Sequence, residues 1–163
     1  MKKKIGLFWL RDDFRLMKNN GLTEATINHD QVVVFYLYKK NIYKDQEAQK
    51  WWLSKSLLNF QKQLSNLNIS LEIIETNSFK IFFDNLMREK DFTIYWNKVY
   101  EPDYLKFDEY LMNILKYKNI HYKRFKGNTL NEIDEIKKSD GTPFKVFTPF
   151  WRTAEKHYIE KIP

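Results

Sequence analysis

Five short apolar runs alternate with amphipathic stretches along the first 126 residues of the chain. The runs lie at 4–9, 31–38, 69–74, 92–96 and 120–125, and the amphipathic stretches lie at 22–28, 46–67, 78–90 and 103–117. The run 31–38 (QVVVFYLY) is apolar on both faces, as an internal strand of a parallel sheet is. Strands that alternate with helices in this way predict a parallel sheet with right-handed crossovers and helices on both faces.

This pattern predicts a three-layer α/β domain of Rossmann-like type with a five-stranded parallel sheet. The longest amphipathic stretch, 46–67, carries residues at helical spacings of three and four that predict one apolar face: Trp52, Leu53, Ser56, Leu57, Phe60, Leu64 and Leu67. After residue 126 the pattern changes to turn signals around 140–143 and one short helical piece at 131–138. We therefore expect a domain core over 1–126 and a closing segment over 127–163.

Composition excludes several classes of site. The chain of 163 residues contains no Cys and three His, so thiol catalysis, disulfides and Cys-based metal sites are excluded, and a His-based metal site is not expected. No apolar run approaches the roughly 18 residues that span a bilayer, and the N-terminus lacks a signal-peptide pattern. We expect a cytoplasmic protein without metal or membrane partner. The net charge of +7 gives mild support for an anionic partner, but a solvated surface explains it better.

Polar clusters follow the predicted strands. In an open α/β sheet, ligands bind beyond the carboxyl ends of the strands, where 9–15, 38–50 and 96–104 are expected to meet. No GxGxxG or P-loop motif is present. The cluster 11–15 (RDDFR) has two interpretations: an ion-paired loop that ties strands together, or Arg11 and Asp13 facing a polar ligand. Glu101 and Asp103 likewise either begin a helix at Pro102 or face the same crevice. No catalytic set of residues can be assembled.

The tryptophans are interpreted mainly as core residues. Trp9 and Trp96 end strands, and Trp52 lies on a helix face, so all three are predicted to be buried. A stacking platform for a planar ligand is the minority interpretation. The sequence shows no interleaving of basic and aromatic residues typical of single-strand binders. Direct DNA binding by this domain is therefore a weaker hypothesis, which rests on the nonspecific binding that Lys-rich surfaces show.

Four motifs, in order, resemble those of the DNA photolyase/cryptochrome family. Residues 9–19 (WLRDDFRLMKN) resemble its opening signature Trp-Phe-Arg-Arg-Asp-Leu-Arg-Leu-x-Asp-Asn. Residues 52–57 (WLSKSL) match a Phe-Leu-x-x-Ser-Leu helix start, and 95–97 (YWN) with Glu101-Pro102 and Asp108 match a fourth-strand segment. Residues 141–151 (GTPFKVFTPFW) are similar to Gly-x-Pro-Tyr-x-Val-Phe-Thr-Pro-Phe-Trp, which closes the family's N-terminal domain.

The resemblance implies a division of labour between two domains. An N-terminal α/β domain would hold a light-harvesting pigment, which is a folate, a deazaflavin or FMN. A larger C-terminal helical domain would hold FAD and the damaged DNA, where light-driven electron transfer splits pyrimidine dimers. The chain is then expected to be the antenna domain alone, as a fragment or half of a split protein. The segment 127–163 would begin the linker to the helical partner, and the chain alone would not be catalytic.

The residues expected to bind the pigment are Arg11, Asp13, Gln49, Glu101 and Asp103, of which the resemblance bears on Gln49 and Asp103. Gln49 occupies a position where many members carry Arg, while Asp103 and Tyr104 replace the Asn and Glu of folate-binding members. Arg11 and Asp13 belong to the opening signature. Two other functions remain open at this point: a blue-light receptor of the cryptochrome branch, and a stand-alone nucleotide-binding α/β module.

Overall fold

Ten helices and strands follow one another in the computed structural model, which describes residues 5–40, 45–89, 91–129, 131–132 and 135–157. In chain order they are β1 (Ile5–Leu10), α1 (Asn20–Asn28), β2 (Val32–Lys39), α2 (Glu47–Ser65), β3 (Ser70–Thr76), α3 (Phe79–Leu86), β4 (Phe92–Asn97), α4 (Pro102–Tyr117), β5 (His121–Phe125) and α5 (Phe147–His157). The chain divides into two compact units, unit 1 at 1–127 and unit 2 at 128–163.

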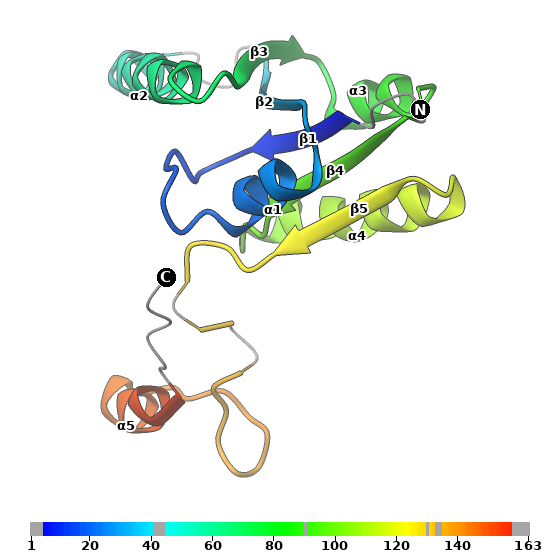
Figure 1. Ribbon diagram of the computed structural model, residues 1–163. Helices are drawn as coiled ribbons and strands as arrows, with labels where there is room; N and C mark the ends of the chain where they lie inside the picture. The colour runs from blue at the N-terminus through cyan, green and yellow to red at the C-terminus, as the bar shows by residue number, and fades with distance from the viewer. Residues whose placement is uncertain (1–4, 41–44, 90, 130, 133–134, 158–163) are drawn as a thin grey trace. The chain divides into compact units, whose positions relative to one another are not determined.

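Unit 1 is built on a five-stranded sheet in the order β3-β2-β1-β4-β5 (Figure 1). Every neighbouring pair is parallel, with Leu7 opposite Val33 on one side and Ile94 on the other. The strand order reverses at β1, because β2 and β3 are added on one side of it and β4 and β5 on the other. The predicted five-stranded parallel α/β fold is confirmed.

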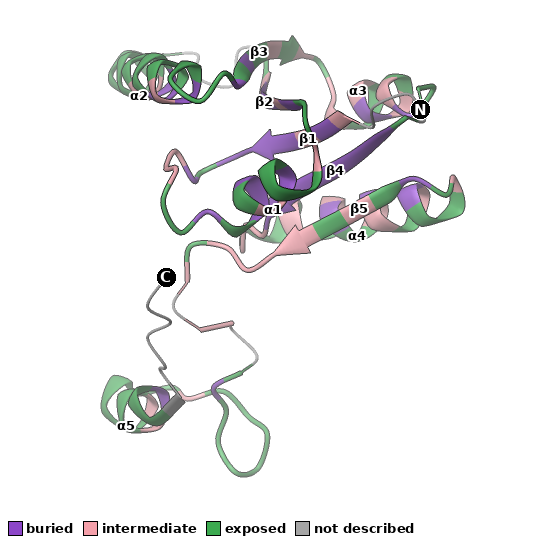
Figure 2. Ribbon diagram, viewed as in Figure 1, coloured by how far each residue is buried: buried purple, intermediate pink, exposed green. Residues whose placement is uncertain are grey.

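Two apolar clusters cover the two faces of the sheet. On one face, Phe8 and Val34 pack with Phe60 of α2 and Leu22 of α1. On the other face, α3 and α4 supply Phe83, Leu111 and Leu115, which pack with Trp9 and Trp96. Figure 2 shows the buried residues concentrated in β1, β4 and the inward sides of the helices. The burial predicted for Trp9 and Trp96 is confirmed.

The prediction that Trp52 is a core residue is wrong. Its side chain is 69% exposed, whereas Leu57, Phe60 and Leu64 of the same helix are buried. A helix turns by about 100° per residue, so Trp52 lies beside the buried stripe and not within it. Leu67, the last residue of the predicted apolar face, is 54% exposed and lies beyond the end of α2 at Ser65. The apolar spacing of three and four therefore located the helix but wrongly assigned Trp52 and Leu67 to its buried side.

Unit 2 contains α5, whose Ala154 is buried together with Ile136. The Asp140 carboxylate accepts hydrogen bonds from the Thr142 backbone N–H at 2.8 Å and hydroxyl at 2.6 Å, which closes the predicted turn around Gly141. The helical piece predicted for 131–138 is absent from its described residues, which form bends and turns, while 133–134 lie outside the described residues. A short helix needs an apolar face packed on the rest of the protein, which the eight-residue α3 has through Phe83, whereas Ile136 is the one buried residue in the described part of 131–138.

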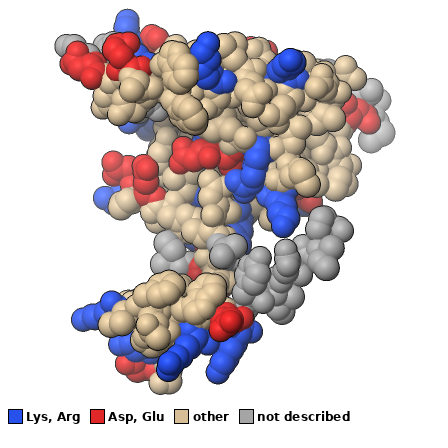
Figure 3. Space-filling model, turned by 90° about the vertical axis from the view of Figure 1, so that its left-hand side faces the viewer, with Lys and Arg blue, Asp and Glu red and all other residues tan. Residues whose placement is uncertain are grey.

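Charged side chains of both signs are mixed over the surface visible in Figure 3. Among the residues that the structure describes, no helix is long and apolar enough to cross a membrane.

Candidate functional site

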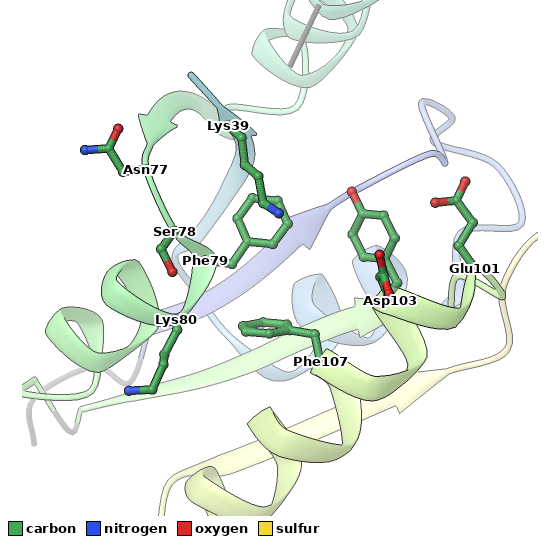
Figure 4. Close-up of a pocket in the computed structure, with 9 residues that line it drawn as sticks. Lys39, Asn77, Ser78, Phe79, Lys80, Glu101, Asp103 and Phe107 are labelled. Carbon is green, nitrogen blue, oxygen red and sulfur yellow. The ribbon is translucent and has the colours of Figure 1, made fainter. Parts of the chain in front are cut away.

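A pocket of about 440 Å³ opens at the carboxyl edge of the sheet in unit 1. Its walls come from the end of β2, from the loop between β3 and α3, and from the start of α4 (Figure 4). Pockets that bind small molecules and cofactors have volumes of about 300–1,000 Å³. In open α/β sheets such pockets lie at this edge, so both size and position suit a ligand.

Three aromatic rings line the pocket between α3 and α4. The Phe79 ring centroid lies 5.9 Å from that of Phe107, at an angle of 69°, and 6.2 Å from that of Tyr104. Trp9 packs behind them, with ring centroids 5.7 Å from Phe79 and 5.9 Å from Phe107. The pocket therefore has a fixed aromatic wall, which can stack against a planar ligand.

Charged and polar groups complete the lining. Lys39 places its ammonium 5.4 Å from the centroid of the Phe79 ring. The other charged and amide or hydroxyl side chains of the lining are those of Asn77, Ser78, Lys80, Glu101 and Asp103. The pocket thus combines cations and carboxylates around an aromatic wall. This set suits a planar molecule with hydrogen-bonding edges, whereas the described lining holds no imidazole that could act as a general base.

Asp12 adds a further carboxylate near Glu101. Loss of solvation raises the pKa of Asp12, and the negative charges of Glu101 and Asp13 raise it further, while Arg11 acts in the opposite direction. The ionised form of Asp12 is therefore less favourable in the folded protein than in the unfolded chain. At neutral pH, where Asp12 is ionised, its charge therefore lowers the free energy of unfolding of unit 1.

Replacing Asp12 with Asn is expected to stabilise unit 1 slightly at pH 7. Asp12 loses only part of its solvation and its side chain still reaches solvent, so screening limits the gain to about 0.5 kcal/mol. The gain must disappear as the pH falls below the ordinary Asp pKa of 3.8, where the side chain is protonated in both states. Denaturant unfolding of both proteins at pH 7 and pH 3 measures it. A loss of stability at pH 7, or an equal gain at pH 3, contradicts this account.

Arg11 and Asp13, both predicted to lie near the pigment, are buried behind the pocket. Arg11 is 3% exposed, and its guanidinium donates to both carboxylate oxygens of Asp108, at 3.0 and 3.3 Å, and to the backbone carbonyl of Asn97. The same guanidinium lies 4.7 Å from the Trp9 ring centroid and 5.4 Å from that of Tyr104. Through Asp108 and Tyr104, Arg11 therefore holds the N-terminal half of α4 in place. It supports the pocket wall from the side that faces away from the pocket.

Asn97, at the end of β4, joins the loop after β1 to the start of α1. Its Nδ2 donates to Asp13 Oδ2 and to Asn19 Oδ1, the latter at 2.7 Å. Its Oδ1 accepts from the backbone N–H of Gly21 at 3.0 Å. A Cβ on Gly21 would lie 2.8 Å from that oxygen and 2.7 Å from the Phe8 ring, so only Gly allows this approach.

The structure brings together some of the predicted site residues and separates others. Glu101 and Asp103 line the pocket, whereas Arg11 and Asp13 lie in the buried network and Gln49 lies exposed on α2. Of the three segments expected to meet, 38–50 reaches the pocket through Lys39 and 96–104 through Glu101, Asp103 and Tyr104. Arg11 of 9–15 supports the pocket wall from behind. Reasoning from the sequence missed the loop 77–80 after β3. The signal was available, since the carboxyl end of every strand of a parallel sheet lies at the same edge.

Comparison with known proteins agrees with the fold. The profile of the family described as DNA photolyase matches residues 6–163. The chain belongs to the DNA photolyase family. This confirms the resemblance that the four sequence motifs indicated.

Photolyases and cryptochromes are both among the relatives. The deoxyribodipyrimidine photo-lyase of Agrobacterium fabrum is 29% identical over 91% of this chain and 31% of its own length. Cryptochrome-2 of Arabidopsis thaliana is 26% identical over 99% of this chain and 27% of its own length. The chain thus spans about a third of the length of the relatives it matches.

Solved structures of photolyases contain the same fold. A class III photolyase from Agrobacterium tumefaciens superposes with a TM-score of 0.83, at 28% identity, over 95% of this chain and 32% of the other. A Synechocystis cryptochrome superposes with a TM-score of 0.76 at 20% identity, over 100% of this chain and 36% of the other. The α/β fold of unit 1 is that of the N-terminal domain of photolyases. Among the described residues, no three His, Cys, Asp or Glu side chains gather as metal ligands would.

Proposed function

We propose that unit 1 is the light-harvesting domain of a deoxyribodipyrimidine photolyase and holds its pigment in the pocket at the carboxyl edge. The observation that carries this proposal is the aromatic wall of Phe79, Tyr104 and Phe107 at the ligand-binding edge of a photolyase fold. Folates, deazaflavins and FMN all combine a flat ring system with polar edges. The rings can stack on the wall while the polar edges bond with Lys39, Glu101 or Asp103.

The remaining partners follow from the family. A helical domain that holds FAD would receive the absorbed energy and would bind the damaged DNA, and neither site is proposed for unit 1. A role in DNA repair places the protein in the compartment that holds the DNA, which in a bacterium is the cytoplasm. Arg11 and Asp13 are proposed to act by positioning the pocket wall, because their side chains are occupied by contacts within the protein.

A signalling role is the second candidate function, since cryptochrome-2 matches the chain over nearly its full length. The sequence identity to the Agrobacterium photo-lyase, 29% against 26% for cryptochrome-2, favours repair. Light-dependent rescue of a repair-deficient cell by the chain together with its helical domain distinguishes the two functions. Rescue supports repair, and failure under otherwise productive expression supports signalling.

Substitution of Tyr104 tests the pocket directly. Replacing Tyr104 with Ala removes one ring of the wall and is expected to weaken pigment binding about tenfold or more. Tyr117 is the matched control, because it lies on the same helix α4 but is 86% exposed and does not line the pocket. Titration of each variant with the pigment, followed by absorbance between the near-UV and the blue, gives the affinities. Equal affinities of the two variants would place the pigment elsewhere.

A further inference from the structure

The solvent-facing side of α2 carries large apolar side chains where a surface helix normally carries polar ones. Trp51, Lys55, Leu58 and Lys62 follow one another at spacings of four, three and four residues, so they form one line about 16 Å long, here called the α2 ridge. Trp51 is 60% and Leu58 56% exposed. The ridge therefore presents aromatic and apolar surface to solvent, opposite the side of α2 that packs on the sheet.

The ridge is also cationic. The chain contains no acidic residue between Glu47 and Glu72, and Glu47 at the start of α2 pairs with Lys50 at 2.8 Å. Lys55 places its ammonium 5.9 Å from the Trp51 ring centroid. Lysines thus alternate with apolar residues along the ridge. The sequence analysis did not predict this combination, because it interpreted the tryptophans mainly as core residues.

The charge and shape of the ridge discriminate among its possible partners. A second copy of the chain would bring one row of lysines against another in a symmetric contact, which like-charge repulsion opposes. A membrane-bound helix needs a broad apolar face, and the broad apolar face of α2 is already buried against the sheet by Leu57, Phe60 and Leu64. A flexible polyanion with flat apolar groups can pair its negative charges with the lysines and stack a flat group on the exposed ring of Trp51.

We propose that the α2 ridge binds single-stranded nucleic acid. Backbone phosphates would contact Lys55 and Lys62, and a base would stack on Trp51. The Trp51 and Trp52 rings are tilted by 41° with centroids 6.3 Å apart, so they do not stack face to face and a ring face remains for a base. This site is separate from the pocket, and the proposal stands independently of the pigment.

Fluorescence anisotropy of a labelled oligothymidylate of about 16 nucleotides, titrated with the purified full chain at several salt concentrations, tests this proposal. Trp51→Ala is expected to weaken binding at least about fivefold, since stacking on an aromatic side chain contributes that much per base. The double variant Lys55→Gln/Lys62→Gln is expected to lower the slope of log affinity against log salt by about 1.4, or about 0.7 for each phosphate that is no longer neutralised.

Matched substitutions on other helices provide the controls. Ile81→Ala on α3 removes a side chain that is 57% exposed, and Lys106→Gln on α4 removes an exposed charge. Both must bind within twofold of the unaltered chain. The proposal is overturned if the chain fails to bind at low salt, or if the ridge variants bind as the controls do. Equal competition by polyglutamate would also overturn it in favour of an acidic protein partner, as would preferential binding to anionic phosphatidylglycerol vesicles in favour of a lipid surface.

Discussion

Replacing Arg11 with Met is expected to lower the free energy of unfolding of unit 1 by about 3–5 kcal/mol. The substitution leaves the Asp108 carboxylate, which is fully buried, without its bidentate partner. Arg124 lies 3.5 Å from the same carboxylate but also pairs with Glu109, so it compensates only in part. Leaving a buried carboxylate without its main counter-charge lowers the stability far more than removing both charges of the pair.

Two further variants isolate this effect in urea unfolding of the purified chain. Arg11→Met/Asp108→Leu removes both charges and should recover much of the loss, because the abandoned carboxylate is gone. Lys80→Met breaks an exposed pair with Asp84, whose charged atoms lie 2.6 Å apart, and should cost no more than about 0.5 kcal/mol. If Arg11→Met costs less than about 1 kcal/mol, Arg11 does not hold the wall, and a direct role at the pigment becomes the better interpretation.

Replacing Asn97 with Asp is expected to destabilise unit 1 by about 3–5 kcal/mol at pH 7, although the two side chains have nearly the same shape. The Asn97 amide donates to Asp13 and Asn19, and both acceptors are buried. A carboxylate at position 97 cannot donate to them and places a second negative charge against Asp13. The loss of stability in this variant therefore measures the contribution of the Asn97 hydrogen bonds and charge, because the packing is nearly unchanged.

The destabilisation in Asn97→Asp should depend on pH in a defined direction. The new carboxyl group holds its proton to a higher pH in the folded protein than in the unfolded chain, because its charged form is buried beside another carboxylate. The loss of stability caused by this carboxyl group is therefore small near pH 4 and grows as the pH rises towards 8. Asn113→Asp, at an exposed position of α4, serves as the control and should change stability little at either pH. A deficit that does not vary with pH would mean that lost packing, not charge, is responsible.

Hydrophobic periodicity predicted the fold of unit 1 because burial of apolar faces dominates its stability. The residues of β2 are apolar on both faces of the strand, and Leu57, Phe60 and Leu64 form an apolar stripe on α2. All these side chains can be buried together in a parallel sheet that is covered by helices. Periodicity was less informative at the flank of a helix, where Trp52 lies just outside the buried stripe. It also failed for 131–138, where local sequence pattern alone does not decide whether a short segment forms a helix.

The candidate site was only partly predictable, for a different reason. Glu101 and Asp103 could be placed near the pocket because they lie four and six residues beyond the carboxyl end of β4. The sequence of 11–15 could not decide between a ligand site and an ion-paired loop, because the deciding partners, Asn97 and Asp108, lie more than 80 residues further along the chain. Contacts between residues so distant in sequence are set by the tertiary fold, and the structure supports the ion-paired interpretation for Arg11.

Titration of the purified chain with methenyl-folate, a deazaflavin, FMN and ATP in turn tests the central claim most directly. The account predicts that one of the three pigments binds to unit 1 with its near-UV or blue absorbance shifted, and that ATP does not displace it. Tyr104→Ala must weaken this binding, while Tyr117→Ala must not. Binding of ATP together with no measurable affinity for any of the three pigments would contradict the account and would identify unit 1 as a nucleotide-binding module.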